Sequence, residues 1–215
     1  MRTSVQILSY NSGNIASIIN AFDYINVDTK IITKSTELLN ELPLIIPGVG
    51  VYEKAMNYLL RESLYDPIRN MFEADTPILG VCLGLQIFSE FGYEYSKTKG
   101  LNFIEGSVKH LNSISQKKLI KCPHIGWSKV KSNNNNLPEK INKIIDENYF
   151  YFVHSYGLIL NNSSSFDFYG TTSYESTNFT SMVINGNLMG TQFHPEKSGE
   201  CGIEILKYFV EEIVN

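Results

Sequence analysis

The sequence has few cysteines and no long apolar run, and both shortages limit what the protein can be. Its three cysteines are scattered and odd in number, and no Cys-x-x-Cys pair occurs, so neither a disulfide framework nor a metal site is predicted. A membrane span needs roughly 18 or more consecutive apolar residues, which are absent. Residues 1–10 lack the apolar core of a signal peptide. With a net charge of −4, the chain has no electrostatic signature of nucleic-acid binding. We expect a cytoplasmic protein that uses no metal or other cofactor.

The first hundred residues alternate between strand-like and helical patterns. Short apolar runs predict strands at 5–8, 30–33, 44–46 and 78–81, and helical spacing predicts helices at 15–24, 52–60 and 64–72. Thr36 is placed to cap a short helix over Leu38 and Leu39. The alternation predicts right-handed βαβ units, and hence an α/β fold with an open, mostly parallel sheet and helices on both faces. The length of 215 residues fits a single domain over residues 1–215.

After Gly100 the pattern changes to short strand-like segments separated by turns. Such segments occur at 103–111, 119–122, 127–131, 149–153, 166–174, 180–184 and 188–192. Asn185-Gly186 is a hairpin signal. We expect an antiparallel β extension in the second half of the chain. A solvated loop at 133–136, a short helix at 137–145 and a C-terminal helix at 202–214 complete the prediction.

The chain is organised around the stretch that contains Cys82. The apolar run 78–81 leads directly into Cys82, which has Gly80 and Gly84 on either side, and a helical pattern follows in which Leu85, Phe88 and Phe91 would face inward. A strand, a sharp turn with a nucleophile and a helix form a nucleophile elbow, here with Cys in place of Ser. A helix N-terminus also favours the thiolate. The alternative is a buried cysteine that only fills space, and a partner base decides between the two.

The candidate base lies in the segment His194-Pro195-Glu196. Pro195 fixes a bend after the strand at 188–193, so that His194 and Glu196 can project toward one site. His194 would take the proton of Cys82 and Glu196 would orient the imidazole, which is the logic of a catalytic triad. In isolation a His-x-Glu segment is more often structural, and only the fold can bring residues 82 and 194 together.

Two motifs together carry a family resemblance. Gly80-Val-Cys-Leu-Gly-Leu-Gln86, followed by Gln192-Phe-His-Pro-Glu-Lys-Ser198, resembles the class I (triad) glutamine amidotransferases, which hydrolyse glutamine and pass the ammonia to a synthase. The resemblance implies a flavodoxin-like fold and covers essentially the whole chain. Residues 47–50, 123–127 and 151–156, with Gly13-Asn14, are most similar to the glutaminase subunits of imidazole glycerol phosphate synthase.

The resemblance implies a role for each residue of these motifs. Cys82 would attack the carboxamide of L-glutamine to give a γ-glutamyl thioester, and His194 would protonate the leaving ammonia and then activate water. Glu196 would orient His194. The backbone N–H groups of Leu83 and Val49 would bind the oxyanion. Glycines on both sides of Val49 permit its peptide to rotate, so we expect the Val49 N–H to turn toward Cys82 only when a partner is loaded with substrate.

The resemblance also implies a binding pocket and a docking face. The glutamine would be held by Gly50, Gln86, His154, Ser155 and Tyr156, with the ring of His154 itself structural. A cyclase subunit with a (β/α)8-barrel fold would be the partner in a heterodimer. Its contacts would include Asn14, Trp127 and Lys197.

Departures from the family pattern leave the pathway open. They occur at residues 9–11, at 51–53 and at Ser128, away from Cys82, His194 and Glu196. The partner would make imidazole glycerol phosphate and AICAR in histidine biosynthesis, or it would amidate a sugar. A catalytically idle regulatory subunit is a further alternative, against which the intact triad argues. A cysteine peptidase is another, against which the segments 47–50 and 123–127 argue.

Overall fold

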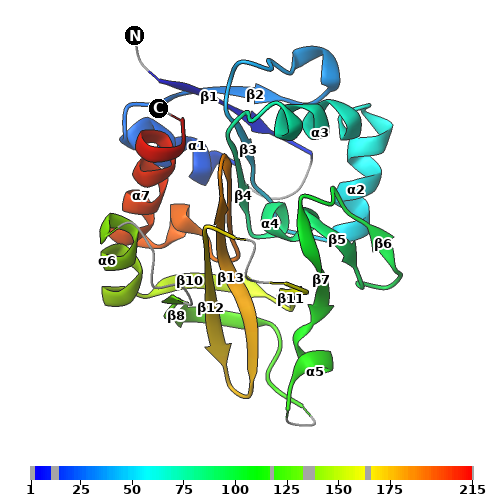
Figure 1. Cartoon of the computed structure of the whole chain (residues 1–215), viewed down its shortest axis with the longest axis vertical. Helices are drawn as coiled ribbons and strands as arrows, with labels where there is room; N and C mark the ends of the chain where they lie inside the picture. The colour runs from blue at the N-terminus through cyan, green and yellow to red at the C-terminus, as the bar shows by residue number, and fades with distance from the viewer. Residues whose placement is uncertain (1–2, 11–14, 117–118, 133–138, 163–165, 215) are drawn as a thin grey trace.

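The computed structural model describes residues 3–10, 15–116, 119–132, 139–162 and 166–214. Asn14, the turn at 11–14 and the asparagine run at 133–136 lie outside the described residues. The described part of the chain folds around one large sheet, whose strands extend from near the top of Figure 1 to its lower half.

Five parallel strands form the core of this sheet. In spatial order they are β2 (Asp28–Ile32), β1 (Ser4–Leu8), β3 (Leu44–Ile46), β4 (Ile78–Val81) and β14 (Leu188–Thr191). The prediction of an α/β fold with a mostly parallel sheet is confirmed. The sequence did not predict that β14, from the last part of the chain, pairs in parallel with β4.

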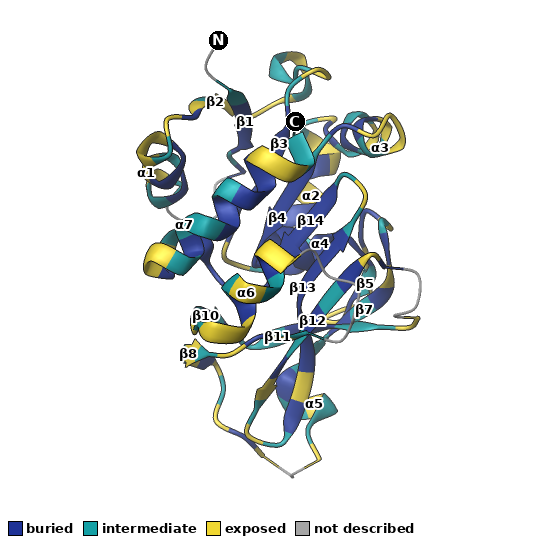
Figure 2. Cartoon of the chain, turned by 60° about the vertical axis from the view of Figure 1, so that its left-hand side comes forward, coloured by how far each residue is buried: buried dark blue, intermediate teal, exposed yellow. Residues whose placement is uncertain are grey.

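Helices cover both faces of the parallel strands because the strand residues alternate in direction. Val5 and Ile7 pack with α1 (Ala16–Tyr24) and α7 (Gly199–Tyr208) on one face. Leu8 packs with α2 (Tyr52–Arg61) and α3 (Tyr65–Glu73) on the other. Figure 2 shows the result: β1, β3, β4 and β14 are almost entirely buried, whereas β2 at the edge of the sheet and the outer sides of the covering helices are exposed.

The second half of the chain extends the sheet with mostly antiparallel strands, as predicted. β13 (Thr177–Asn185) pairs with β14 and leads to β11 (Tyr156–Leu160), β7 (Ile104–His110), β5 (Ser89–Gly92) and β6 (Thr98–Lys99). β12 (Phe168–Tyr174) pairs with β13 and with β9 (Lys131–Ser132). β8 (His124–Ser128) and β10 (Phe150–His154) form a separate two-stranded sheet.

Four local predictions were wrong. The helix after Cys82, α4 (Leu83–Ile87), ends after five residues, and Phe91 lies in β5 because residues 89–92 pair with β7 and β6. Residues 119–122 form no strand, and the predicted strand 127–131 is divided between β8 and β9. Thr36 does not cap a helix: it lies inside the single turn η1 (Ser35–Glu37), after which Leu38 is already extended.

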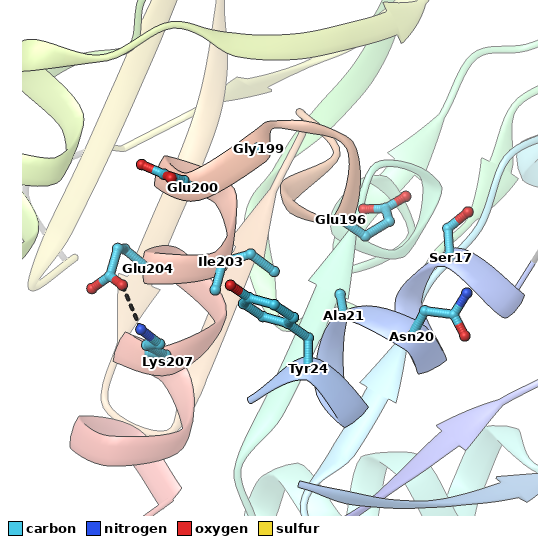
Figure 3. Close-up of a pocket in the computed structure, with 10 residues that line it drawn as sticks. All are labelled: Ser17, Asn20, Ala21, Tyr24, Glu196, Gly199, Glu200, Ile203, Glu204 and Lys207. Atoms are coloured by element: carbon cyan, nitrogen blue, oxygen red, sulfur yellow. Dashed lines mark hydrogen bonds and ion pairs between the residues drawn. The ribbon is translucent and has the colours of Figure 1, made fainter. Parts of the chain in front are cut away.

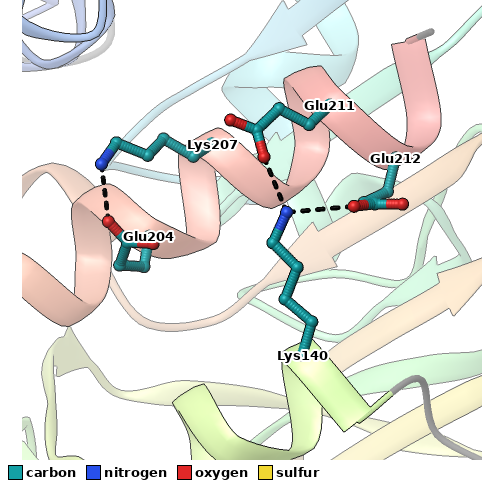
Figure 4. Close-up of polar contacts among 5 residues, drawn as sticks. All are labelled: Lys140, Glu204, Lys207, Glu211 and Glu212. Carbon is teal, nitrogen blue, oxygen red and sulfur yellow. Dashed lines mark hydrogen bonds and ion pairs between the residues drawn. The ribbon is translucent and has the colours of Figure 1, made fainter.

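The C-terminal helical segment is joined to α6 (Glu139–Glu147) at the surface. The Lys140 Nζ lies 2.6 Å from a carboxylate oxygen of Glu211 and 3.0 Å from one of Glu212, both in η3 (Phe209–Val214), as Figure 4 shows. These side chains are about half exposed, so the pairs contribute little to stability. Within the described ranges, no helix has the length and apolar character to cross a membrane.

Candidate active site

Cys82 sits on a strained turn between β4 and α4. Its backbone has φ 55° and ψ −102°, a conformation that non-glycine residues rarely adopt. A Cβ on Gly84 would collide with the carbonyl of Ile46, and one on Gly80 would lie 2.6 Å from the ring of Phe88. The Cys82 N–H donates to the Thr191 carbonyl of β14 at 2.7 Å. The turn therefore needs both glycines and holds a nearly buried thiol, 4% exposed, above the end of the sheet.

His194 and Glu196 reach the same place because β14 lies beside β4. Thr191 is paired with Val81, so the residues that follow β14 emerge next to Cys82. Pro195 begins the short turn η2 (Pro195–Lys197), which brings the carboxylate of Glu196 back onto the imidazole. The Nδ1 of His194 lies 2.7 Å from Oε1 of Glu196, and the two side chains are only 3% and 8% exposed.

The charge state of His194 follows from these neighbours. Burial alone would lower its pKa, but Cys82 and then the carboxylate of Glu196 outweigh burial and raise the pKa to about 10. Nδ1 carries the proton that it donates to Glu196. Nε2 is buried and has no hydrogen-bond partner among the described residues. The pairing of Thr191 with Val81 places His194 beside the turn that carries Cys82. A buried imidazolium next to a thiol is suited to nucleophilic catalysis.

A cavity of about 230 Å³ opens beside Cys82. The thiol lines it, together with every residue that the sequence assigned to oxyanion or glutamine binding, namely Val49, Gly50, Leu83, Gln86, His154, Ser155 and Tyr156. Sequence reasoning missed three further lining residues, Glu94, Pro123 and Val153. Glu94 had no motif signal, and it reaches the cavity wall because its carboxylate accepts a hydrogen bond from the Tyr52 N–H at 2.8 Å.

The Leu83 N–H is already occupied. It donates to the carbonyl oxygen of Gly48 at 3.1 Å. Because the N–H and C=O of a trans peptide point in opposite directions, the Val49 N–H of the same peptide is directed away from the Leu83 N–H. Neither of the two predicted oxyanion donors is therefore available in this conformation. Gly50 follows with φ 130°, which a residue with a side chain rarely adopts.

Two buried histidines, of which His154 lines the cavity, form a chain of hydrogen bonds. His154 Nδ1 contacts the Tyr156 carbonyl at 2.9 Å, and its Nε2 lies 3.2 Å from Nδ1 of His124, whose Nε2 lies 3.0 Å from the Ser128 hydroxyl. The carbonyl can only accept, so each Nδ1 carries the proton and each Nε2 accepts. Burial lowers the pKa of His124 to about 4 and that of His154 to about 3, so both rings are neutral.

The residues assigned to docking lie on the surface where they are described. Trp127 is 55% exposed on β8, with its ring edge-on to Tyr151 at 5.9 Å, so it is not a core residue. Lys197 is exposed in η2, directly after Glu196. Asn14 lies outside the described residues.

A larger hollow of about 720 Å³ lies between α1 and α7, behind Glu196. Figure 3 shows Glu196 at one end of it, near Ser17 of α1, with Glu204 and Lys207 paired at the other. Neither Cys82 nor His194 lines this hollow. Across the described ranges, no group of three or more His, Cys, Asp or Glu side chains is arranged to hold a metal ion.

Comparison with known proteins agrees with this geometry. Residues 7–213 match the family model of class-I glutamine amidotransferases. The chain belongs to this family. It is 39% identical over 209 residues to the imidazole glycerol phosphate synthase subunit HisH of Listeria monocytogenes serotype 4b, covering 97% of this chain and 96% of the relative. It is 36% identical over 207 residues to the HisH subunit of Sulfurimonas denitrificans, covering 96% and 97%.

Two solved structures show the same fold. PurLQS from Thermotoga maritima superposes with a TM-score of 0.70 at 16% identity, covering 98% of both chains. A glutamine amidotransferase from the same organism superposes with a TM-score of 0.61 at 18% identity, covering 98% of this chain and 85% of the other. These likenesses support the fold class, while the HisH relatives point to one branch of the family.

Proposed function

We propose that this class I glutamine amidotransferase is the glutaminase subunit of an imidazole glycerol phosphate synthase. It works in the cytoplasm as one domain, hydrolyses L-glutamine and delivers ammonia to a cyclase subunit with a (β/α)8-barrel fold. The heterodimer makes imidazole glycerol phosphate and AICAR in histidine biosynthesis. The observation that carries the proposal is the buried set of Cys82, His194 and Glu196 beside a small cavity. The HisH relatives support the choice of synthase.

Glutamine hydrolysis follows from the positions of the three side chains. The Cys82 sulfur attacks the carboxamide carbon and the C=O electron pair moves onto oxygen. The C–N bond then breaks, His194 gives its proton to the departing nitrogen, and ammonia leaves a γ-glutamyl thioester. In the second half-reaction His194 takes a proton from water as the oxygen of that water bonds to the thioester carbon, which releases glutamate and the thiolate. Glu196 holds the imidazole through Nδ1 in both steps.

In this proposal, the peptide group that joins Gly48 to Val49 controls the reaction. Rotation of this peptide removes the Gly48 carbonyl from the Leu83 N–H and turns the Val49 N–H toward the cavity, which supplies both oxyanion donors at once. Loss of a single donor lowers the rate by about 10²–10³. The partner, once loaded with its nucleotide substrate, favours the rotated form. Glutaminase activity should therefore rise when the acceptor substrate is added to the complex, and Gly50→Pro should reduce that rise.

The test of the function is Cys82→Ala in the complex with the cyclase subunit. Glutamine hydrolysis should be lost, whereas added ammonia should still support cyclisation because only ammonia production depends on the thiol. A glutamine-like chloroketone should label the wild type once, at Cys82. Retained hydrolysis in Cys82→Ala would reject the mechanism. Wild-type hydrolysis coupled to a sugar acceptor, and not to the cyclase, would instead favour the sugar-amidating alternative.

A further inference from the structure

A row of buried polar groups leads away from the sulfur of Cys82. The side-chain amide of Gln192 donates to the sulfur at 3.5 Å, and its Oε1 accepts from Nε2 of Gln86 at 3.1 Å. The same Nε2 donates to the Tyr156 carbonyl at 2.7 Å. Gln192 is fully buried and Gln86 is 5% exposed, so these hydrogen bonds form out of contact with water. The row connects the nucleophile to the wall of the glutamine cavity.

The direction of every hydrogen bond in this row is fixed by the carbonyl at its end. The Tyr156 carbonyl can only accept, so the amide nitrogen of Gln86 must face it. The second N–H of that nitrogen then points to Gln192, whose facing atom must be its oxygen. The Gln192 nitrogen is therefore the atom that faces Cys82. The amide orientation that ordinary diffraction data leave ambiguous is determined here by the network itself.

The backbone gives Gln192 little freedom to move. It directly follows β14, and its N–H donates to the Ser181 carbonyl of β13 at 2.9 Å. The Thr191 hydroxyl donates to the Phe193 carbonyl at 3.0 Å. Phe193, the next residue, is fully buried. Because its backbone is fixed, Gln192 can in turn restrict the side chains that it contacts.

We propose that Gln192 is a positioning residue for the nucleophile. Its amide N–H holds the sulfur of Cys82 and favours the thiolate, and its amide oxygen locks Gln86. Gln86 then has both N–H groups engaged, and its Oε1 accepts no hydrogen bond from the described residues and is left for the substrate. An oxygen at this place accepts from the α-ammonium of an amino acid and repels its carboxylate. This inference rests on the proposed glutaminase function, which assigned Gln192 no role.

The chain offers a matched control in Gln6 of β1. Gln6 is also fully buried, and its amide donates to the Leu39 and Leu42 carbonyls and accepts from the Leu39 N–H. These partners belong to the loop before β3 and not to the cavity. Gln192→Met and Gln6→Met each replace a buried amide by an apolar side chain of similar length, so they differ mainly in whether Cys82 is involved.

The experiment measures how fast iodoacetamide alkylates Cys82 in the isolated chain at pH 7. All variants carry Cys122→Ser and Cys201→Ser, so that only one thiol reacts, and near-ultraviolet circular dichroism verifies the fold. Gln192→Met should slow alkylation about 10-fold to 100-fold, the effect expected for a hydrogen bond to a charged group. Gln6→Met should stay within about twofold of the parent. Gln192→Asn is too short to reach both partners, should slow alkylation to an intermediate degree, and serves if the methionine variant does not fold.

Equal alkylation rates in the parent, Gln192→Met and Gln6→Met would overturn the proposal. So would an equal slowing in both variants, because it would reflect general loosening of the fold. The assay uses neither glutamine nor the cyclase, so it is independent of the proposed function. If the wild-type complex fails to hydrolyse glutamine while the alkylation contrast stands, the function is wrong and the role of Gln192 is right. If the complex hydrolyses glutamine but Gln192→Met and Gln6→Met do not differ in alkylation rate, the function is right and the role of Gln192 is wrong.

Discussion

The molecule contains two buried histidine environments. The histidine in one is protonated, and the two histidines in the other are neutral. His194 is 2% exposed and has a pKa raised to about 10, whereas the equally buried His124 has one lowered to about 4 and His154 one lowered to about 3. Burial acts in the same direction on all three. The difference lies in the partners: a thiol and a carboxylate for His194, but only a hydroxyl, a carbonyl and each other for the pair. By the proposed mechanism the first environment transfers protons, whereas the second is structural.

The largest test converts the reactive environment into the neutral one. In Glu196→Gln, Oε1 can still accept from Nδ1 of His194, but the negative charge is gone. The pKa of His194 should fall, and kcat for glutamine should drop about 10³-fold, since loss of the orienting carboxylate in a triad costs up to about 10⁴. The measurement is steady-state hydrolysis in the complex with acceptor substrate. Glu200→Gln, an exposed change four residues further on, should leave kcat unchanged. Equal rates in both variants would remove Glu196 from the mechanism.

A second test converts the neutral environment toward the charged one. Ser128→Asp places a carboxylate where the hydroxyl now lies, 3.0 Å from Nε2 of His124. The pKa of His124 should rise from about 4 to above 6. Nuclear magnetic resonance of the ring Cε1–H signals would follow the titration. Ser128→Asn supplies a neutral partner and should leave the pKa low. If the two variants titrate alike, the partner does not set the charge state.

The third test uses stability against pH. Folded His124 and His154 stay neutral down to about pH 4 and about pH 3, whereas in the unfolded chain both bind protons near 6.5. Below pH 6.5 the unfolded state therefore holds more protons, and the free energy of unfolding falls as the pH falls, by up to about 1.4 kcal/mol per pH unit for each histidine. Between pH 6.5 and 5, His124→Gln should reduce the change of the urea-denaturation midpoint with pH by about half. A wild-type stability that does not change over this range would contradict the neutral pair.

The smallest expected effect is on Lys197, an exposed charge next to Glu196. Lys197→Ala should change the melting temperature by no more than about a degree, because isolated surface charges contribute little. By the proposed docking role it should nevertheless weaken the stimulation of glutaminase activity by the cyclase. Lys54→Ala, a lysine on α2, is the control. A large loss of stability with unchanged coupling would make Lys197 structural.

The sequence predicted the parts of the fold that depend on local pattern. The strands Leu44–Ile46 and Ile78–Val81 have the predicted bounds, because fully buried parallel strands are continuous apolar runs. The turn around Cys82 was recognisable because its glycines are needed for close backbone contacts. The structure places Cys82, His194 and Glu196 together as predicted, although their catalytic roles remain a proposal. The predicted continuation of α4 as far as Phe91 was wrong because residues 89–92 pair with β7 and β6, a tertiary contact that the helical spacing of Phe88 and Phe91 does not reveal.

Features that depend on tertiary pairing were not predictable in this way. The segment that became β14 resembled the antiparallel strands around it, and nothing local indicated that it would pair in parallel with β4. Gln192 stood inside the motif that revealed His194, yet its contact with Cys82 exists only because two strands from distant parts of the chain meet. Glu94 reached the cavity through a hydrogen bond to the start of α2 that no spacing announces.

The position of β14 has a consequence for how the molecule is made. Four of the five parallel strands come from the first 81 residues, but the fifth is formed by residues 188–191 and lies between β4 and β13. A chain that emerges from the ribosome N-terminus first holds β4 as an unpaired, apolar edge until nearly all of the sequence has been synthesised. Such an edge can pair with another chain, and closing it requires a contact across more than a hundred residues, which slows folding. Yield at high expression rates should therefore depend on how quickly this late strand reaches its gap.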